Sequence, residues 1–258
     1  MSMSGPRGDD VVIAVDGPSG SGKSTTARGV ARRLGLRYLD TGAMYRATTW
    51  ALLRRGVDVD DPEAVAAAAR DVRLDVGTDP DRPTIAADGV DVAGPIRGPE
   101  VTASVSAVSA VPAVRTLLVA RQRELIGAGG IVVEGRDIGA VVAPDAELKV
   151  FLTAESAERA ARRHAETGGA PEQVATTEAD LARRDTLDST RTTSPLAKAE
   201  DAVVVDTTHL GLEDVIDRIA ALLAERRTEA GRTGAGTGAA GRGAAGRDGA
   251  GGTGTARS

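Results

Sequence analysis

The chain has 258 residues, and its 32 basic and 37 acidic side chains give a formal net charge of −5. The acidic balance lacks the basic surface that a general nucleic-acid binder needs. Only four aromatic residues and no cysteine are present, which argues against base-stacking platforms and excludes disulfide bonds and thiol chemistry. No apolar run approaches the roughly 18 residues of a membrane span. We therefore expect a cytoplasmic monomer that binds neither membrane nor nucleic acid.

The sequence also contains no asparagine. This absence excludes the guanine-reading Asn-Lys-x-Asp motif of GTPases and the metal-binding asparagine of the protein-kinase catalytic loop. The two histidines, His164 and His209, stand far apart in the chain, so a histidine-ligated metal centre is not expected either.

Short β-branched runs alternate with segments of helical periodicity, which predicts an α/β fold with a mainly parallel sheet. Residues 1–10 are polar and contain glycine and proline, so we expect a flexible N-terminus before a folded domain over residues 11–228. Core strands are expected at residues 11–15, 36–39, 131–133, 148–152 and 202–205. Helices are expected at residues 23–34, 44–55, 63–70, 100–109, 113–126, 155–167, 171–187 and 212–227.

Two regions depart from this alternation. From Val72 onward, three short strand-like pieces follow one another, and Asp88-Gly89 is typical of a tight hairpin turn. We therefore expect a small antiparallel insert within residues 72–96. Residues 229–258 are rich in glycine and alanine and show no apolar period, so we expect this tail to be disordered.

The segment Gly17-Pro18-Ser19-Gly20-Ser21-Gly22-Lys23-Ser24 lies between an expected strand and an expected helix. Its spacing matches the P-loop pattern G-x-x-x-x-G-K-[ST] in the context that the pattern requires. Glycines let the backbone turn its N–H groups toward a phosphate, and the helix N-terminus adds its positive dipole end. We expect Lys23 to reach the β- and γ-phosphates and the Ser24 hydroxyl to bind Mg²⁺. The segment therefore predicts binding of a nucleoside triphosphate.

Two further polar segments follow expected strands, at the sheet edge where α/β proteins bind ligands. In residues 40–46, Thr41 can face a ligand and Arg46 can hold an acceptor phosphate, although an ordinary strand–turn–helix with a solvated arginine fits the same pattern. Residues 134–139 place Glu134, Arg136 and Asp137 beside glycines directly after an apolar strand. This arrangement favours a functional role.

The expected helices at 155–167 and 171–187 are rich in arginine and are joined by Gly168-Gly169. We interpret this pair as a lid, over about residues 156–191, that closes on phosphates. A solvated, charged helical hairpin is the alternative for the same pattern. The arginines concerned are Arg159, Arg162, Arg163, Arg183, Arg184 and Arg191.

Together these segments resemble bacterial cytidylate kinase, in the P-loop nucleoside monophosphate kinase family, and the likeness covers about residues 11–227. The resemblance implies an α/β P-loop NTPase fold with a five-stranded parallel sheet, an antiparallel insert in the monophosphate-binding part and a helical lid. It also implies ATP-dependent, Mg²⁺-dependent phosphorylation of CMP and dCMP to CDP and dCDP. The motifs that carry it are residues 15–24 and 40–46, Gly135-Arg136-Asp137-Ile138-Gly139, Pro144-Asp145-Ala146 and Arg184-Asp185-x-x-Asp188-x-x-Arg191.

The resemblance further implies a role for each matching residue. Lys23, Arg136 and Arg184 would stabilise the transferring phosphoryl group. Ser106, Arg115 and Asp137 would recognise the cytosine, and Asp188 with Arg191 the ribose. The ATP phosphates would be held by Gly17, Pro18, Ser19, Gly20, Ser21, Gly22, Lys23, Ser24, Thr25, Arg159 and Arg163. The CMP site would be lined by Thr41, Arg46, Ser106, Arg115, Arg136, Asp137, Asp188 and Arg191.

Two residues depart from the family pattern. Glu134 stands where aspartate is common, which bears on metal and water geometry, and Ala140 stands where threonine is common. Two other interpretations stay open: a P-loop kinase that acts on a different small acceptor, and a non-enzymatic, nucleotide-dependent switch. Phosphoryl transfer from ATP to CMP separates both from the favoured interpretation.

Overall fold

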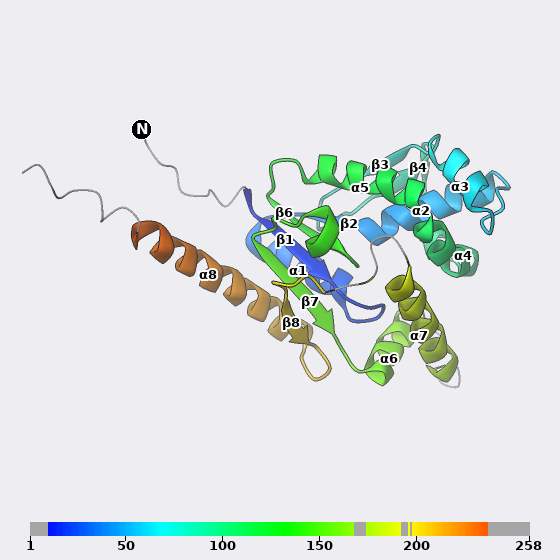
Figure 1. Cartoon of the computed structure of the whole chain (residues 1–258). Helices are drawn as coiled ribbons and strands as arrows, with labels where there is room; N and C mark the ends of the chain where they lie inside the picture. Colours follow the sequence, from blue (N-terminus) through cyan, green and yellow to red (C-terminus); the bar gives the residue numbers. More distant parts are fainter. Residues whose placement is uncertain (1–9, 168–173, 192–195, 197, 237–258) are drawn as a thin grey trace, which may run out of the picture.

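A computed structural model describes residues 10–167, 174–191, 196 and 198–236 (Figure 1). Its centre is a sheet of five parallel strands in the order β2-β6-β1-β7-β8. Every core strand expected from the sequence is present, within two residues of its expected bounds, and the α/β fold class is confirmed. The strands are β1 (Val12–Asp16), β2 (Arg37–Asp40), β6 (Ile131–Gly135), β7 (Leu148–Thr153) and β8 (Val203–Asp206).

Helices cover both faces of the sheet (Figure 1), which is why its strands consist of almost continuous apolar residues. On one face, Ile13 and Val15 pack in the core with α1 and α8. On the other face, Ala14 and Val133 pack in a second core with α2, α4 and α5. The bounds of these helices are α1 Lys23–Leu34, α2 Thr41–Arg54, α3 Pro62–Ala69, α4 Pro99–Ala110, α5 Pro112–Ile126 and α8 Leu212–Gly236.

The expected insert is a three-stranded antiparallel sheet of β3 (Leu74–Val76), β4 (Ile85–Ala87) and β5 (Val90–Asp91). Asp88 adopts a φ of 52° in the hairpin turn, and its carboxylate accepts a hydrogen bond from the Arg73 N–H at 3.0 Å. A short 3₁₀ turn, Pro95–Arg97, then leads into α4.

Helix α2 begins three residues before the expected start. The Asp40 carboxylate accepts a hydrogen bond from the Ala43 N–H at 2.8 Å and thereby caps the helix at its N-terminus. Thr41 therefore lies in the first turn of α2 and not in a preceding loop.

The lid expected from the sequence is a pair of neighbouring helices, α6 (Ser156–Thr167) and α7 (Val174–Thr190), at the end of β7 (Figure 1). The Gly168-Gly169 connection lies outside the described residues. Helix α7 also contacts α4, so the lid meets the part of the molecule that contains the insert.

The expectation of a disordered tail from residue 229 is wrong for its first eight residues, because α8 continues to Gly236. Helical hydrogen bonding propagates from the packed part of α8, and the Thr228 hydroxyl donates to the Ala224 carbonyl at 2.8 Å. Residues 237–258 lie outside the described residues, as do residues 1–9 of the expected flexible N-terminus.

No single helix in the described ranges is long and apolar enough to cross a membrane. Helices α4 and α5 meet that test only when they are joined, and the chain bends by 94° between them.

Candidate active site

The carboxyl ends of adjacent strands bring the expected motifs together. In the parallel register, Asp16 of β1 lies beside Gly135 of β6, and Asp40 of β2 lies beside Glu134. The P-loop leaves β1 at this edge, and the chain leaves β6 at Arg136. Strand β7 ends at the same edge and leads to the lid helix α6. The parallel sheet thus gathers segments that are more than 100 residues apart in the sequence.

The P-loop is folded tightly against its surroundings. Gly17 has a φ of +151°, and a Cβ atom there would lie 2.2 Å from the Leu152 carbonyl oxygen, so only glycine fits. The Lys23 ammonium group donates to the Pro18 carbonyl at 2.8 Å, within the loop itself. Burial, and then the nearby Arg136, lower the pKa of Lys23. A nearby polyanion would relieve both penalties, because it favours the charged lysine.

Ser24, Glu134 and Tyr38 form a polar corner beside the P-loop. The Ser24 hydroxyl donates to one Glu134 carboxylate oxygen at 3.0 Å, and the Tyr38 hydroxyl donates to the other. Glu134 is only 3% exposed, and burial, followed by the Asp40 charge, raises its pKa. The corner therefore offers hydroxyl and carboxylate oxygens, which are the ligands that Mg²⁺ prefers.

Arg115 of α5 and Asp137 after β6 form a buried ion pair, and both residues are less than 5% exposed. The guanidinium group of Arg115 stacks on the Tyr45 ring, 5.4 Å from its centroid. Arg191 approaches Asp137 from the lid side, with Nη2 at 3.7 Å from Oδ1. Three of the residues that the sequence assigns to one CMP site are thus brought together.

Arg136 connects the P-loop to α7. Its guanidinium group donates to the Gly17 carbonyl at 2.8 Å and to the Ser19 hydroxyl at 2.6 Å. Its Nε lies 3.0 Å from a carboxylate oxygen of Asp188, and the other Asp188 oxygen lies 3.8 Å from Arg191. Arg136 and Asp188, predicted to bind the same substrate, therefore form a direct ion pair.

A group of arginines stands where the insert side of the molecule faces the lid. Burial, and then the charges of Arg184 and Arg163, lower the pKa of Arg46. Burial, and then Arg136, lower the pKa of Arg184. The Arg184 Nε is buried and has no hydrogen-bond partner among the described residues. An excess of buried positive charge of this kind favours a bound anion.

Other residues expected in the site have protein partners of their own. The Thr41 hydroxyl donates to the Glu134 carbonyl at 2.7 Å, and Arg159 donates to the Ser19 carbonyl at 2.9 Å. Arg46 donates to the Ile96 carbonyl and to the Thr102 hydroxyl. The Ser106 carbonyl accepts a hydrogen bond from the Ser109 hydroxyl at 3.1 Å, and the expected contact of Ser106 with cytosine stays a prediction.

Asp16 is a functional candidate that the sequence analysis missed. Its two carboxylate oxygens accept hydrogen bonds from the Ile138 and Gly139 N–H groups, each at 2.8 Å. Burial outweighs these bonds and raises the pKa of Asp16 to about 6. The available signal was an acidic residue at the end of an apolar strand, directly before the P-loop. The sequence motifs include Tyr45 and Asp185 but assign no role to either, and their contacts make both functional candidates.

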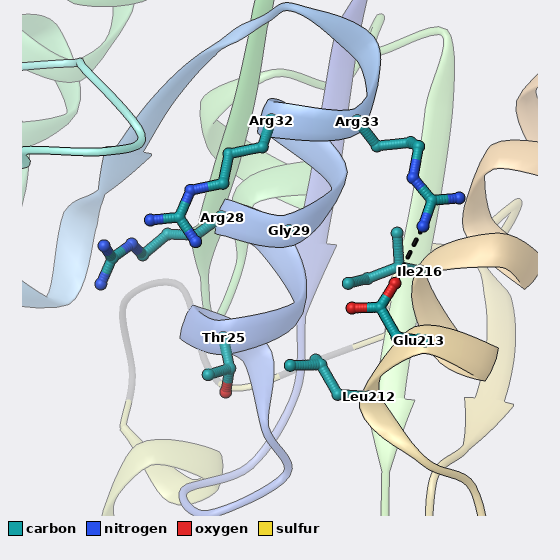
Figure 2. Close-up of a pocket in the computed structure, with 8 residues that line it drawn as sticks. All are labelled: Thr25, Arg28, Gly29, Arg32, Arg33, Leu212, Glu213 and Ile216. Carbon is teal, nitrogen blue, oxygen red and sulfur yellow. Dashed lines mark hydrogen bonds and ion pairs between the residues drawn. The ribbon is translucent and has the colours of Figure 1, made fainter.

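A pocket of about 420 Å³ lies on the other side of the P-loop helix, between α1 and the start of α8 (Figure 2). Its arginines already have protein partners: Arg32 pairs with Asp81 at 2.7 Å, and Arg33 pairs with Glu213 at 2.9 Å. Arg28 donates to the Pro80 carbonyl at 3.1 Å. The positive charge of this pocket is therefore largely satisfied, in contrast to that of the arginine group near Arg184.

A sequence model of the cytidylate kinase family matches residues 13–225. The chain belongs to the cytidylate kinase family. A cytidylate kinase of Streptomyces griseus subsp. griseus is 58% identical over 222 residues, which cover 85% of this chain and 95% of that protein. A cytidylate kinase of Mycolicibacterium paratuberculosis is 54% identical over 220 residues, which cover 84% of this chain and 96% of that protein. The family resemblance found in the motifs is thereby confirmed.

The match ends at residue 225, so the final turns of α8 and the glycine-rich residues after them lie beyond what the family model describes. The matched region contains the main sheet except for Val12, the first residue of β1, together with the P-loop, the insert and the described lid helices. Membership of the cytidylate kinase family therefore concerns the entire candidate active site, whereas the role of each side chain remains a prediction.

Proposed function

We propose that the protein transfers the γ-phosphoryl group of ATP to CMP and dCMP, giving ADP and the corresponding nucleoside diphosphates. The observation that carries this proposal is the buried Arg115–Asp137 pair, whose Asp137 follows β6 at the edge of the sheet where the P-loop leaves β1. The amino group of cytosine needs a hydrogen-bond acceptor, and its ring nitrogen and carbonyl need donors. A carboxylate and a guanidinium group side by side offer both.

The phosphates of the two substrates would meet between the P-loop and the arginine group. Lys23 and the P-loop N–H groups would hold the ATP phosphates, with Arg159 and Arg163 reaching from the lid. Arg46, Arg136 and Arg184 would surround the CMP phosphate and the transferring group. Since the positive charges of these arginines repel one another, an anion between them is favoured before and during transfer.

The residues at the Ser24 corner fit a magnesium ion. Glu134 is buried, and the neighbouring Asp40 charge further raises the pKa of Glu134, so a nearby cation would favour the ionised Glu134 carboxylate. Ser24 would hold the ion, with Glu134 and Asp40 in support. When bound, Mg²⁺ supplies positive charge to the β- and γ-phosphates. Glu134 contributes here through the hydrogen bond that orients the Ser24 hydroxyl.

Catalysis by this chain would consist of positioning and charge stabilisation. The attacking phosphate oxygen of CMP is already anionic near neutral pH, so no strong general base is needed. No side chain has to become phosphorylated. Lys23, Arg136 and Arg184 would instead stabilise charge that spreads over the transferring phosphoryl group.

Membership of the cytidylate kinase family disfavours both alternatives, a P-loop kinase with another acceptor and a nucleotide-dependent switch. The direct test is a coupled ADP-release assay with ATP and CMP, dCMP, UMP or AMP. We expect the highest kcat/KM for CMP and dCMP. Higher kcat/KM for AMP, or slow ATP hydrolysis that ignores every acceptor, would contradict the proposal.

Replacement of Asp137 by alanine tests the base-recognition site. Asp137→Ala removes the carboxylate from a buried position and leaves Arg115 without its partner. One charged hydrogen bond is worth about 1.5–3 kcal/mol, so KM for CMP should rise by roughly 10- to 100-fold. KM for ATP should change little. A rise confined to KM for ATP would mean that Asp137 serves the other substrate.

A further inference from the structure

At Ser19 the lid contacts the P-loop through hydrogen bonds, and each polar group of this residue has a different partner. Its N–H donates to Oδ1 of Asp185 at 3.1 Å. Its carbonyl accepts from Arg159 at 2.9 Å, and its hydroxyl accepts from Arg136 at 2.6 Å. Two lid helices and the loop after β6 thus converge on one residue of the P-loop.

Asp185 connects these contacts. Its Oδ2 pairs with Arg159, while Oδ1 lies 3.8 Å from the Arg136 guanidinium group. The Asp185 side chain is 16% exposed, so solvent screens these interactions only weakly. The carboxylate therefore stands between two arginines that would otherwise repel each other, and binds the P-loop backbone at the same time.

The lid backbone also packs directly on the P-loop next to this contact. A Cβ atom at Gly20, where φ is +77°, would lie 2.7 Å from the Arg159 carbonyl oxygen. The clamped Arg159 keeps its Nε buried and without a hydrogen-bond partner among the described residues. Its guanidinium group is therefore fixed by Asp185 and the Ser19 carbonyl and still has one donor that no described residue uses.

We propose that Asp185 is a positioning residue for phosphoryl transfer: it fixes Arg159 against the Ser19 peptide and so holds the lid arginine in register with the P-loop. The inference rests on the proposed function, and it assigns to Asp185 a role that acts through Arg159. Asp185 itself does not touch substrate.

The first test is Asp185→Asn, which keeps an acceptor for the Ser19 N–H but removes the charge that binds Arg159. Misplacement of a catalytic group by about 1 Å costs roughly 100-fold, so kcat should fall by about 10- to 100-fold. KM for CMP should stay within about threefold. Asp180→Asn is the matched control, because Asp180 lies on the same helix and, among the described residues, its carboxylate forms an exposed pair with Arg183. An unchanged kcat in Asp185→Asn, or an equal loss in the control, would overturn the inference.

A double-mutant cycle with Arg159→Lys separates positioning from general stabilisation of the lid. Lysine keeps the charge but cannot bind the Ser19 carbonyl and Asp185 with one planar group. If Asp185 acts through Arg159, the double variant should be no slower than the slower single variant. Losses in kcat that multiply would refute the coupling. Should Asp185→Asn fail to fold, Asp185→Glu carries the same cycle, since it keeps the charge and shifts it by one methylene.

Binding of a non-hydrolysable ATP analogue, measured by calorimetry, keeps this test independent of the acceptor. If the wild-type protein binds the analogue but phosphorylates no nucleoside monophosphate, the proposed function fails, and the Asp185 inference is still tested. We expect the analogue to bind about 3- to 10-fold more weakly to Asp185→Asn, because the lid arginine is no longer fixed. Tighter binding would show that Asp185 competes with a phosphate, and would overturn the proposal.

Discussion

Burial lowers the pKa of Lys23, whereas the nearby carboxylates of Glu134 and Asp16 raise this pKa and so favour the charged ammonium group. The Lys23 ammonium group donates to the Pro18 carbonyl within the P-loop. Replacement by alanine removes the main protein partner of the β- and γ-phosphates. Loss of one preorganised donor of this kind lowers kcat by roughly 10²–10³-fold. Steady-state kinetics of Lys23→Ala with ATP and CMP should show that loss, and near-normal turnover would remove the P-loop from the mechanism.

Asp16 makes the stability of the protein depend on pH. Burial raises its pKa from 3.8 to about 6 in the folded protein. The folded state thus keeps this proton at pH values where the unfolded chain has lost it. The stabilisation is complete below about pH 4 and is lost as the pH rises through about 6. At about 1.4 kcal/mol per pKa unit, the loss is on the order of 3 kcal/mol.

The comparison of wild type with Asp16→Asn isolates this effect, because all other titrations are shared. Urea unfolding at pH 4 and pH 7 gives the unfolding free energy of both proteins. As the pH rises from 4 to 7, the unfolding free energy of the wild type should fall relative to that of Asp16→Asn. A difference that is constant with pH would mean that Asp16 titrates normally in the folded state.

The residues that sequence analysis could identify are those whose role depends on local spacing. Arg136 and Asp137 stand out because an apolar strand ends in charges flanked by glycine. The contacts of Asp16 and Tyr45 could not be predicted in this way, since their partners Ile138, Gly139 and Arg115 are distant in the chain. Such contacts depend on the register of the sheet, which no local pattern encodes.

At the scale of elements, the alternation of apolar runs and helical periods predicts every strand of the main sheet. The ends of helices are harder to predict, because they depend on side-chain caps and on how far helical hydrogen bonding propagates from the packed part of the helix. Asp40 starts α2 early by binding the Ala43 N–H. Helix α8 continues past Arg227 into a segment whose composition favours disorder. Both errors arise where one local interaction outweighs average propensity.

Asp61 is a cap whose contribution can be measured. Its carboxylate accepts hydrogen bonds from the Glu63 and Ala64 N–H groups at 2.9 and 3.1 Å, with Pro62 in the first turn of α3. Asp61→Ala should destabilise the protein by about 1 kcal/mol. At about 2–4 °C per kcal/mol, Tm should fall by a few degrees, with kcat unchanged.

Asp60→Ala is the matched control for the cap, because Asp60 is exposed and its carboxylate accepts no hydrogen bond among the described residues. Thermal unfolding of both variants should show a lower Tm for Asp61→Ala alone. Equal Tm values would indicate that α3 is stabilised by its packing against α2 and α5 and not by its cap.

For the whole molecule, the sequence predicts a parallel sheet but not the strand order β2-β6-β1-β7-β8. That order places β1 in the centre, with β6 on one side and β7 on the other. The P-loop is therefore flanked by the strand that delivers Arg136 and by the strand that leads to the lid. The contact between Asp185 and Ser19 depends on this order, because the lid follows β7 and the P-loop follows β1, and no local sequence pattern encodes which strands are neighbours.

Truncation of the C-terminal region tests which of its residues the folded domain needs for stability. Near the end of the family match, Arg226 donates to the Asp201 carbonyl at 2.9 Å. Arg227 binds Glu147 with two hydrogen bonds, at 2.6 and 3.2 Å. Removal of residues 237–258 keeps these contacts, and the glycine-rich composition of that segment provides no apolar face. We therefore expect kcat and Tm to be unchanged.

Removal of residues 226–258 should instead lower the stability, because it deletes both arginines. Each contact is partly exposed, so together they contribute about 1–2 kcal/mol. Tm should then fall by about 2–4 °C for each kcal/mol lost. The double variant Arg226→Ala/Arg227→Ala in the full chain should reproduce most of that fall, which separates the contacts from chain length. If removal of residues 237–258 lowers Tm as much as removal of residues 226–258, then residues 237–258 themselves stabilise the folded protein.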